Sequence, residues 1–392
     1  MVVDQRSARR WPTAFQLAVA VLPLACTVGS NEDAGFGTGA ATDPGDEDQG
    51  VEDTTGGDEA SAEATDGNDD ETGAGEGDES TGAEELPPVA PDGYYVVGNT
   101  IYHESGSPHV FLGVDRPSLE WNPAGEDLSA QDYQLMASWG SNAVRIALNQ
   151  GFWLESSVVY SPEYKGRIDT QIDWAHAAGM DVILDLHWSD RGDWGVTPGQ
   201  QRMADNHSVI FWADVAQRYA HDGRVIFELY NEPHDVTWQV WRDGGDSGDG
   251  FMAVGMQTLY DTVRNAGADN LVVLGGLDYG YDLGGVPGTP LTGYNITYAT
   301  HPYDLPGKGP SDWEGDWGFL TADHPVLITE FGTFDCSTDY LSQLISYAAQ
   351  RDLSWTAWAW YPGGCDFPAL INDWAGTPSA AGQIVRTALM AG

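Results

Sequence analysis

Positive charge is scarce in this chain. Its 392 residues include 16 Lys and Arg against 60 Asp and Glu, which gives a formal net charge of −44 at pH 7. A chain this acidic is repelled by nucleic acid and by anionic lipid, so neither is expected as a partner. An uncharged polymer, such as a neutral polysaccharide, remains compatible with this charge.

The acidic residues are concentrated near the N-terminus. Residues 31–91 include 20 Asp and Glu and no Lys or Arg, and much of the remainder is Gly, Ala, Ser and Thr. Such a stretch buries too little apolar surface to offset the backbone entropy of folding, which predicts a disordered acidic linker over residues 27–91. No Asp-x-Asp-x-Asp-Gly loop with a terminal Glu occurs in it, so a solvated spacer is favoured over a calcium site.

Long hydrophobic runs are also missing. The apolar run Ala14–Ala25 follows three arginines and is too short to cross a bilayer core of about 30 Å comfortably, which predicts a signal peptide over residues 1–26. Cys26 follows the run directly and resembles the lipidated cysteine of a bacterial lipoprotein signal. Pro23 departs from that pattern, so a plain cleaved signal is the alternative. The protein is expected to be exported, and a lipid on Cys26 is the only membrane attachment expected.

The chain changes character at about Asp92. Short apolar runs then alternate with longer amphipathic stretches, as expected of strands buried on both faces and the helices between them. Eight strands are predicted, at Val110–Val114, Ala143–Leu148, Asp181–Leu186, Val225–Tyr230, Leu271–Leu274, Thr297–Thr300, Pro325–Thr329 and Ser354–Trp360. Helices are predicted, among other places, at Asp169–Ala178, His207–Ala220, Met252–Asn265 and Asp339–Arg351.

This alternation predicts an α/β fold, a (β/α)8 or TIM barrel, over residues 92–392. A doubly wound sheet would show the same alternation, but no Gly-x-Gly-x-x-Gly follows the first strand, which removes the best support for it. The Gly-rich segment Gly280–Asn295 is expected to be a long loop over the barrel mouth, with a short or missing helix.

Cysteine is nearly absent from the predicted barrel, which contains only Cys336 and Cys365. No spacing of Cys and His suggests a zinc site. The two cysteines follow the seventh and eighth predicted strands, and neighbouring strands of a barrel bring such loops side by side. We expect a disulfide between them in an exported protein, with two free buried thiols as the alternative.

Polar and aromatic residues stand in or directly after several predicted strands. Active sites of TIM barrels lie at the C-terminal ends of the strands, so these positions are the candidates for function. In chain order they are Arg145, His187, Trp188, Asn231, Glu232, His301, Tyr303, Glu330, Trp358 and Trp360.

Two glutamates of this set follow the fourth and seventh strands and should face each other across the mouth. Glu232 and Glu330 are 98 positions apart, or about 33 per strand–helix unit, as this fold requires. Two facing carboxyl groups can divide the cleavage of a glycoside if they lie about 5–5.5 Å apart. One protonates the leaving oxygen and the other attacks the anomeric carbon.

The segments Val225–His234 (VIFELYNEPH) and Ile328–Gly332 (ITEFG) resemble the two signatures of glycoside hydrolase family 5, the cellulase-rich family of clan A. The likeness extends from about Tyr94 to Gly392. It implies that Glu232 is the acid/base, that Glu330 is the nucleophile, and that no metal or organic cofactor is needed. It also implies that the cleavage subsite is lined by Arg145, His187, Asn231, His301, Tyr303 and Trp358.

Each implied role has a chemical reason. Asn231 can hydrogen-bond the sugar 2-hydroxyl, a contact that strengthens in the transition state. Arg145 and Tyr303 can keep Glu330 ionised, because a cation and a hydroxyl donor both favour a carboxylate. Trp358 offers a flat apolar face to a pyranose ring.

Other candidates have structural alternatives. His301 is expected to orient Glu232 or to bind substrate, whereas Arg145 and His187 could be only an interior ion-pair residue and a satisfied core histidine. Glu228 shares a strand face with Glu232 and is expected to form an ion pair deeper in the barrel. Trp188 and Trp360 are candidate sugar contacts with core packing as the alternative, and Trp355 is expected to pack. Residues that could line outer subsites are Glu120, Trp121 and Asp190.

These features predict a monomeric, retaining glycoside hydrolase that acts on a β-linked polysaccharide, β-1,4-glucan. The closest alternatives are a β-mannanase and an exo-acting β-glucosidase of the same family. No long insertion walls off the mouth, which favours endo action. A non-catalytic carbohydrate-binding barrel should lack one of the two glutamates, and a metal-dependent barrel hydrolase should carry a His-x-His after its first strand, which is absent.

Overall fold

A computed structural model describes residues 86–392. The expected signal peptide over residues 1–26, its candidate lipidation site Cys26, and residues 27–85 of the expected linker lie outside the described residues. Among the described residues, no helix is long and apolar enough to cross a membrane.

The folded part begins earlier than the expected boundary at Asp92. Ala90 is buried, and the carbonyl oxygen of Pro91 accepts a hydrogen bond of 2.8 Å from the backbone of Gly223. The carbonyl oxygen of Pro88 accepts one of 2.7 Å from Asn295 Nδ2. The last residues of the predicted linker are therefore part of the barrel domain, held by backbone contacts that their composition does not reveal.

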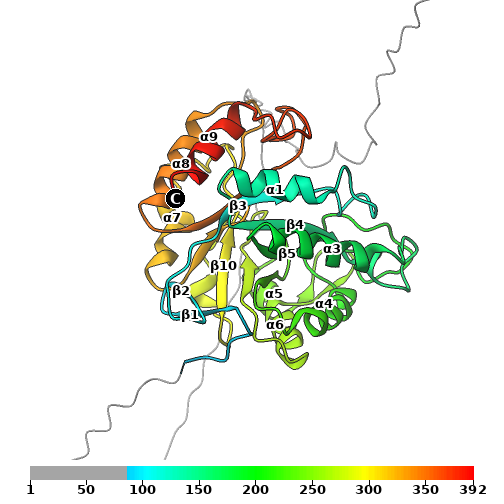
Figure 1. The fold of residues 1–392 in the computed structure, drawn as a ribbon. Helices are drawn as coiled ribbons and strands as arrows, with labels where there is room; N and C mark the ends of the chain where they lie inside the picture. The colour runs from blue at the N-terminus through cyan, green and yellow to red at the C-terminus, as the bar shows by residue number, and fades with distance from the viewer. Residues whose placement is uncertain (1–85) are drawn as a thin grey trace, which may run out of the picture. The chain divides into compact units, whose positions relative to one another are not determined.

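Eight parallel strands form a closed barrel (Figure 1), which confirms the predicted TIM-barrel fold. Nearly all of their residues are buried, because helices cover the outside of the barrel and side chains fill the inside. In order around the barrel they are β3 (Leu112–Arg116), β4 (Ala143–Asn149), β5 (Asp181–Trp188), β6 (Val225–Glu228), β9 (Val272–Gly275), β10 (Ile296–Thr300), β11 (Val326–Ile328) and β12 (Ser354–Ala357).

Helices follow the strands along the chain. They are α1 (Ala130–Ser138), α2 (Gln150–Trp153), α3 (Tyr164–Ala177), α4 (Asn206–Tyr219), α5 (Trp238–Asp243), α6 (Met256–Asn265), α7 (Trp313–Asp316), α8 (Asp339–Ala349) and α9 (Ala380–Leu389). In α4, the Asp205 side chain caps the helix by accepting hydrogen bonds from the backbone of His207 and Ser208, and Phe211 and Val215 are buried one turn apart. A capped start and an apolar stripe of this kind are what a helix packed on a sheet requires.

The predicted elements differ from the observed ones mainly at their ends. Strand β5 continues to Trp188, which pairs with Asn149, whereas β6 and β12 end before Tyr230 and Trp360 as the chain bends into the loops of the mouth. Helix α6 begins at Met256, because Met252 and Ala253 form strand β8 and pair with β7 (Gly245–Asp246). Gly280–Asn295 is the expected loop, with one 3-10 turn, η2 (Val286–Gly288).

A hairpin closes the end of the barrel at which the strands begin. Strands β1 (Tyr94–Val97) and β2 (Thr100–His103) pair antiparallel. Tyr94 and Ile101 pack in one buried cluster with inward residues of six barrel strands, and the Tyr94 hydroxyl donates a hydrogen bond of 2.6 Å to Asp181, the first residue of β5. The hairpin does not cover the opposite end, where the strands finish, and a functional site can lie there.

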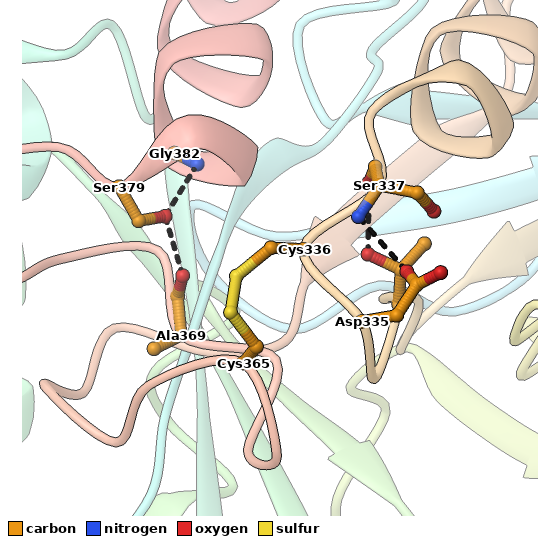
Figure 2. Close-up of a disulfide and its surroundings, with 8 residues drawn as sticks. Asp335, Cys336, Ser337, Cys365, Ala369, Ser379 and Gly382 are labelled. Atoms are coloured by element: carbon orange, nitrogen blue, oxygen red, sulfur yellow. Dashed lines mark hydrogen bonds between the residues drawn. A yellow bond between two sulfur atoms is a disulfide. The ribbon is translucent and has the colours of Figure 1, made fainter.

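The predicted disulfide is confirmed. Cys336 and Cys365 are bonded with a Cα–Cα distance of 5.0 Å, and Figure 2 shows the bond joining the two loops that carry them. One loop follows β11 and the other follows β12. The disulfide therefore links loops next to Glu330 and Trp358.

Replacing both cysteines by serine should lower the free energy of unfolding by about 3 kcal/mol, because the bond closes a loop of 29 positions and restricts the unfolded chain. Thermal unfolding with and without reductant measures the effect. Equal Tm values for oxidised and reduced protein would contradict this expectation.

Candidate active site

Glu330 follows β11 at the end of the barrel where the strands finish. Its Oε1 accepts a hydrogen bond of 2.7 Å from Arg145 Nη1, and its Oε2 accepts one of 2.9 Å from the hydroxyl of Tyr303. The Nδ1 atoms of His187 and His301 lie 3.9 and 3.8 Å from its oxygens. Hydrogen bonds to both oxygens fix the orientation of this carboxyl group, which suits a nucleophile.

Arg145 projects from β4 into a ring of acceptors. Its Nε donates to Glu228 at 2.5 Å, and its Nη2 donates to Asn231 Oδ1 at 2.7 Å and contacts Asp185 at 3.0 Å. The side chain of Arg145 has no exposed surface. The prediction that Arg145 contacts substrate directly is therefore wrong. The charge of Arg145 acts on Glu330 instead. Arg145 is also an interior ion-pair residue, as the alternative expectation for it stated.

Glu228 occupies the deeper position expected for it. Thr329 Oγ1 donates to it at 2.8 Å in addition to Arg145 Nε. Burial alone would raise the pKa of Glu228, but Arg145 and His301 lower it to about 2. Glu228 is therefore a permanent negative charge below the mouth.

Glu232 follows β6 across the mouth from Glu330. Its Oε1 lies 3.1 Å from His301 Nδ1, and its Oε2 accepts a hydrogen bond from Gln200 Nε2. Burial raises the pKa of Glu232, but His301, His187 and Gln200 together outweigh it, and the net pKa is lowered. The two carboxyl groups thus have different partners, a guanidinium for Glu330 and an imidazole for Glu232.

His301 connects the mouth to the layer below it. Burial by itself would lower the pKa of His301, but Glu330, Glu228 and Glu232 raise it to about 10. The imidazole is therefore protonated at neutral pH, so that Nδ1 donates to Glu232 and Nε2 donates to Thr329 Oγ1 at 2.9 Å. The expectation that His301 orients Glu232 agrees with this contact.

The two glutamates lie close together. One oxygen of Glu232, one of Glu330 and a ring nitrogen of His301 all fall within 4.8 Å of one another. Inverting glycosidases hold their carboxyl groups about 6.5–9.5 Å apart to admit a water, and retaining enzymes hold them about 5–5.5 Å apart. A closest approach of single oxygens within 4.8 Å leaves less room than an inverting pair needs and agrees with the spacing of a retaining pair.

Two groups of side chains in the described part of the chain have the spacing of metal ligands. The first is Glu232, His301 and Glu330, in which both ring nitrogens of His301 are engaged in hydrogen bonds, with Glu232 and with Thr329. The second is Asp190, Asp205 and His207, where hydrogen bonds occupy the carboxylates. Asp205 caps α4, and Asp190 accepts from His207 and Gln150. Asp190 therefore serves this buried network rather than an outer subsite.

Asn231 and His187 complete the floor of the mouth. Asn231 Nδ2 has no hydrogen-bond partner among the described residues, so its amide has a donor left for a ligand. His187 Nδ1 donates to Asp185 at 2.7 Å. Burial by itself would lower the pKa of His187, but Asp185, Glu330 and Glu120 raise it to about 9.

The tryptophans separate into two groups. Trp358 stacks on His187 with ring centroids 5.5 Å apart, and Trp188 keeps part of its surface exposed, so both remain at the mouth. Trp360 is fully buried, and its Nε1 donates to Asp132 at 2.6 Å, so the prediction that it contacts sugar is wrong. Trp355 packs on Phe331 as expected.

Three exposed apolar residues follow successive strands β9, β10 and β11, and we call them the mouth rim: Tyr279, Leu305 and Phe334. Tyr279 stacks on His234, two residues after Glu232, at 4.1 Å. Phe334 stacks on Tyr303 at 5.3 Å. Sequence analysis missed the rim and Gln200, because loops carry no periodic pattern.

Residues 103–364 match the family model described as Cellulase (glycosyl hydrolase family 5). The chain belongs to glycoside hydrolase family 5. This family 5 chain is 25% identical over 319 residues to Endoglucanase E-5 of Thermobifida fusca, covering 75% of this chain and 63% of that protein. It therefore spans less than two thirds of that relative.

Other relatives carry different names. The chain is 25% identical over 337 residues to an endoglucanase of Paenibacillus polymyxa, covering 72% of this chain and 83% of the relative. It is 24% identical over 302 residues to a mannan endo-1,4-β-mannosidase of Salipaludibacillus agaradhaerens, covering 72% and 87%. Among solved structures, the β-glucanase SdGluc5_26A of Saccharophagus degradans matches with a TM-score of 0.64 and 23% identity, over 78% of this chain and 94% of that one.

Proposed function

We propose that this protein hydrolyses β-1,4-glucan internally and with net retention of anomeric configuration. Glu330 is the nucleophile and Glu232 is the acid/base. The observation that carries the proposal is the close approach of two carboxyl groups with unlike partners. A second carboxylate so near the first suits covalent displacement rather than attack by an intervening water.

The contacts of each carboxyl group suit its step. Arg145 and Tyr303 each donate a hydrogen bond to one oxygen of Glu330 and so fix its carboxyl group for attack on the anomeric carbon. Asn231 Nδ2 is buried and has no hydrogen-bond partner among the described residues, and we assign it to the sugar 2-hydroxyl of a bound substrate. After its proton has gone to the leaving oxygen, Glu232 deprotonates a water that attacks the anomeric carbon. The bond from that carbon to Glu330 breaks, which frees the Glu330 carboxylate and leaves the proton on Glu232.

A lowered pKa does not by itself suit Glu232 to act as an acid. In the free protein the proton resides on His301, whose Nδ1 is 3.1 Å from Glu232 Oε1. A bound sugar excludes water and disfavours a separated pair of charges, which moves the proton along this hydrogen bond to Glu232. Glu232 can then donate it to the leaving oxygen.

Release of reducing sugar tests the substrate. Carboxymethylcellulose, β-mannan, lichenan and laminarin would be compared side by side, and we expect the highest kcat/KM on the two polymers that contain β-1,4-linked glucose. A preference for β-mannan would support the other candidate, which the mannanase relative favours. An absence of activity on all of these polymers would instead favour the alternative of a non-catalytic carbohydrate-binding barrel.

The mouth rim predicts endo action. Tyr279→Ala should lower kcat/KM on carboxymethylcellulose by roughly 2- to 10-fold, because an exposed aromatic contact is worth about 0.5–1.5 kcal/mol. Activity on a short aryl glycoside should change less. Tyr102→Ala is the matched control, since Tyr102 also stacks on an aromatic ring, that of Tyr95, but in the hairpin at the far end of the barrel. Equal losses in the two variants would contradict a role in binding the polymer.

Export is part of the proposal. The Cys336–Cys365 disulfide supports it, because such bonds persist in oxidising compartments. Residues 1–26 would act as the signal, with Cys26 lipidated or removed, and the enzyme would work as a monomer. Mass spectrometry of the mature N-terminus distinguishes a lipidated Cys26 from a plain cleaved signal.

A further inference from the structure

Asp115 is a buried carboxyl group that the proposed mechanism does not use. It lies in β3 and pairs in register with Arg145 of β4. Its Oδ1 is 3.5 Å from Arg145 Nη1, and its Oδ2 has no hydrogen-bond partner among the described residues. A buried carboxyl group in a mostly apolar strand, with one oxygen that accepts no hydrogen bond, requires an explanation.

One oxygen of Asp185 and one of Glu120 also lack a partner among the described residues, but every other carboxyl group around the mouth has a closer donor than Asp115 has, including Glu120, which accepts from the backbone of Ser118 at 2.7 Å. Glu330 has Arg145 and Tyr303, and Glu228 has Arg145 and Thr329. Asp185 has Arg145 at 3.0 Å and His187 at 2.7 Å, and Glu232 has His301 and Gln200. Arg145 donates hydrogen bonds of 2.5–2.7 Å to Glu228, Glu330 and Asn231. The hydrogen bond to Asp115 is the longest of the four, at 3.5 Å.

A count of charges leads to the same group. Six buried carboxyl groups (Asp115, Glu120, Asp185, Glu228, Glu232 and Glu330) face three cations, Arg145, His187 and His301. Ionising all six would leave an excess of three negative charges in a buried site, which is costly unless protons are taken up. The group with the fewest donors is the one that takes a proton at least cost.

We propose that Asp115 is kept as a neutral carboxylic acid beside Glu330, so that the charge of Arg145 is left to the nucleophile. Asp115 is a positioning residue that acts through Arg145, and the inference rests on Glu330 having the role proposed above. An ionised Asp115 would compete with Glu330 for Nη1.

The groups that face Asp115 from neighbouring elements agree with this assignment. Burial raises the pKa of Asp115 well above its ordinary value, Arg145 of β4 opposes that rise, and Glu330 after β11 and Glu228 of β6 add to it. His301 after β10 opposes it more weakly. The net direction is upward.

Thermal unfolding of Asp115→Asn tests the protonation state without any assay of activity. A carboxyl group whose pKa is higher in the folded than in the unfolded chain stabilises the fold fully below the unfolded pKa of about 4, and that stability is lost as pH rises. Asn has no proton to take up. The Tm of Asp115→Asn relative to wild type should therefore rise between pH 4 and pH 7, by about 2–4 °C or more.

An ionised Asp115 paired with Arg145 predicts the opposite sign, a relative Tm that falls from pH 4 to pH 7, and that result would overturn the proposal, as would no change. If Asp115→Asn does not fold, Asp115→Ser removes the same titrating group in a smaller volume. Infrared spectra of wild type at pH 7 provide a second measurement, in which the carbonyl stretch of a protonated carboxyl group should be present and should weaken in the variant.

The role in positioning is tested by the pH dependence of kcat/KM. A neutral Asp115 adds no charge near Glu330. The fall of kcat/KM on the acidic side of the pH profile (the acid limb) should therefore occur at the same pH in Asp115→Asn as in wild type. Glu228→Gln is the matched control, because removing an ionised carboxylate from the same ring should move the acid limb down by about one pH unit. An equal downward shift in Asp115→Asn would show that Asp115 is ionised and would overturn the inference. If neither variant shows the expected pH dependence of kcat/KM while the Tm changes as predicted, the role of Glu330 as nucleophile is rejected. The neutral state of Asp115 is then still supported.

Discussion

Replacing Glu330 by alanine is expected to reduce kcat by on the order of 10⁴ or more on every substrate, because no other group is placed to attack the anomeric carbon. The fold should persist. Azide should restore cleavage of an activated aryl glycoside by entering the space of the lost carboxylate. Attack from that side gives a glycosyl azide of inverted, α configuration, which NMR identifies.

Glu314→Ala provides the control for handling and folding, since Glu314 is an exposed residue of α7 that pairs with Arg351 on the outside of the barrel. It should retain wild-type rates. A Glu330→Ala protein that unfolds cooperatively but still turns over polysaccharide at more than a few per cent of the wild-type rate would rule out Glu330 as the nucleophile.

Replacing Glu232 by alanine should give a loss that depends on the leaving group. An activated aryl glycoside needs little protonation, so formation of the glycosyl-enzyme should be nearly as fast as in wild type, whereas polysaccharide cleavage should fall by about 10²–10⁴-fold. Rates for aryl glycosides with leaving groups of graded pKa measure this dependence. Azide should again accelerate turnover, but here it replaces the activated water and gives the β-glycosyl azide.

The anomeric configuration of the azide product therefore separates the two roles within one experiment. An α product from Glu330→Ala and a β product from Glu232→Ala would match the proposed assignment. The opposite pairing would exchange the roles. Equal losses on good and poor leaving groups in Glu232→Ala would show that this residue donates no proton in the rate-limiting step.

Much of the site followed from local pattern. Apolar runs predicted the strands because a strand buried on both faces has few polar positions, and the fold places residues after those strands at one end of the barrel. Glu232, Glu330, His301 and Tyr303 meet there as a consequence of order along the chain. The pairing of Cys336 with Cys365 followed in the same way, from adjacent strands.

Other features depend on which distant residues pack together. Trp360 follows a strand as Trp358 does, yet its ring is buried because Asp132, 228 positions away, accepts its N–H. Gln200 reaches Glu232 from a loop without a motif. The polar residues Asp115 and Asp185 interrupt apolar strands and were a visible signal, but their partners were not.

The sequence by itself determined the barrel, the two facing glutamates and the disulfide, because these depend on periodicity and on the order of elements. Only the tertiary structure decided which charged groups share Arg145 and which carboxyl group receives the longest of its hydrogen bonds. Those outcomes depend on differences of about an ångström between side chains from six strands and the loops that follow them, and no pattern along the chain encodes such distances.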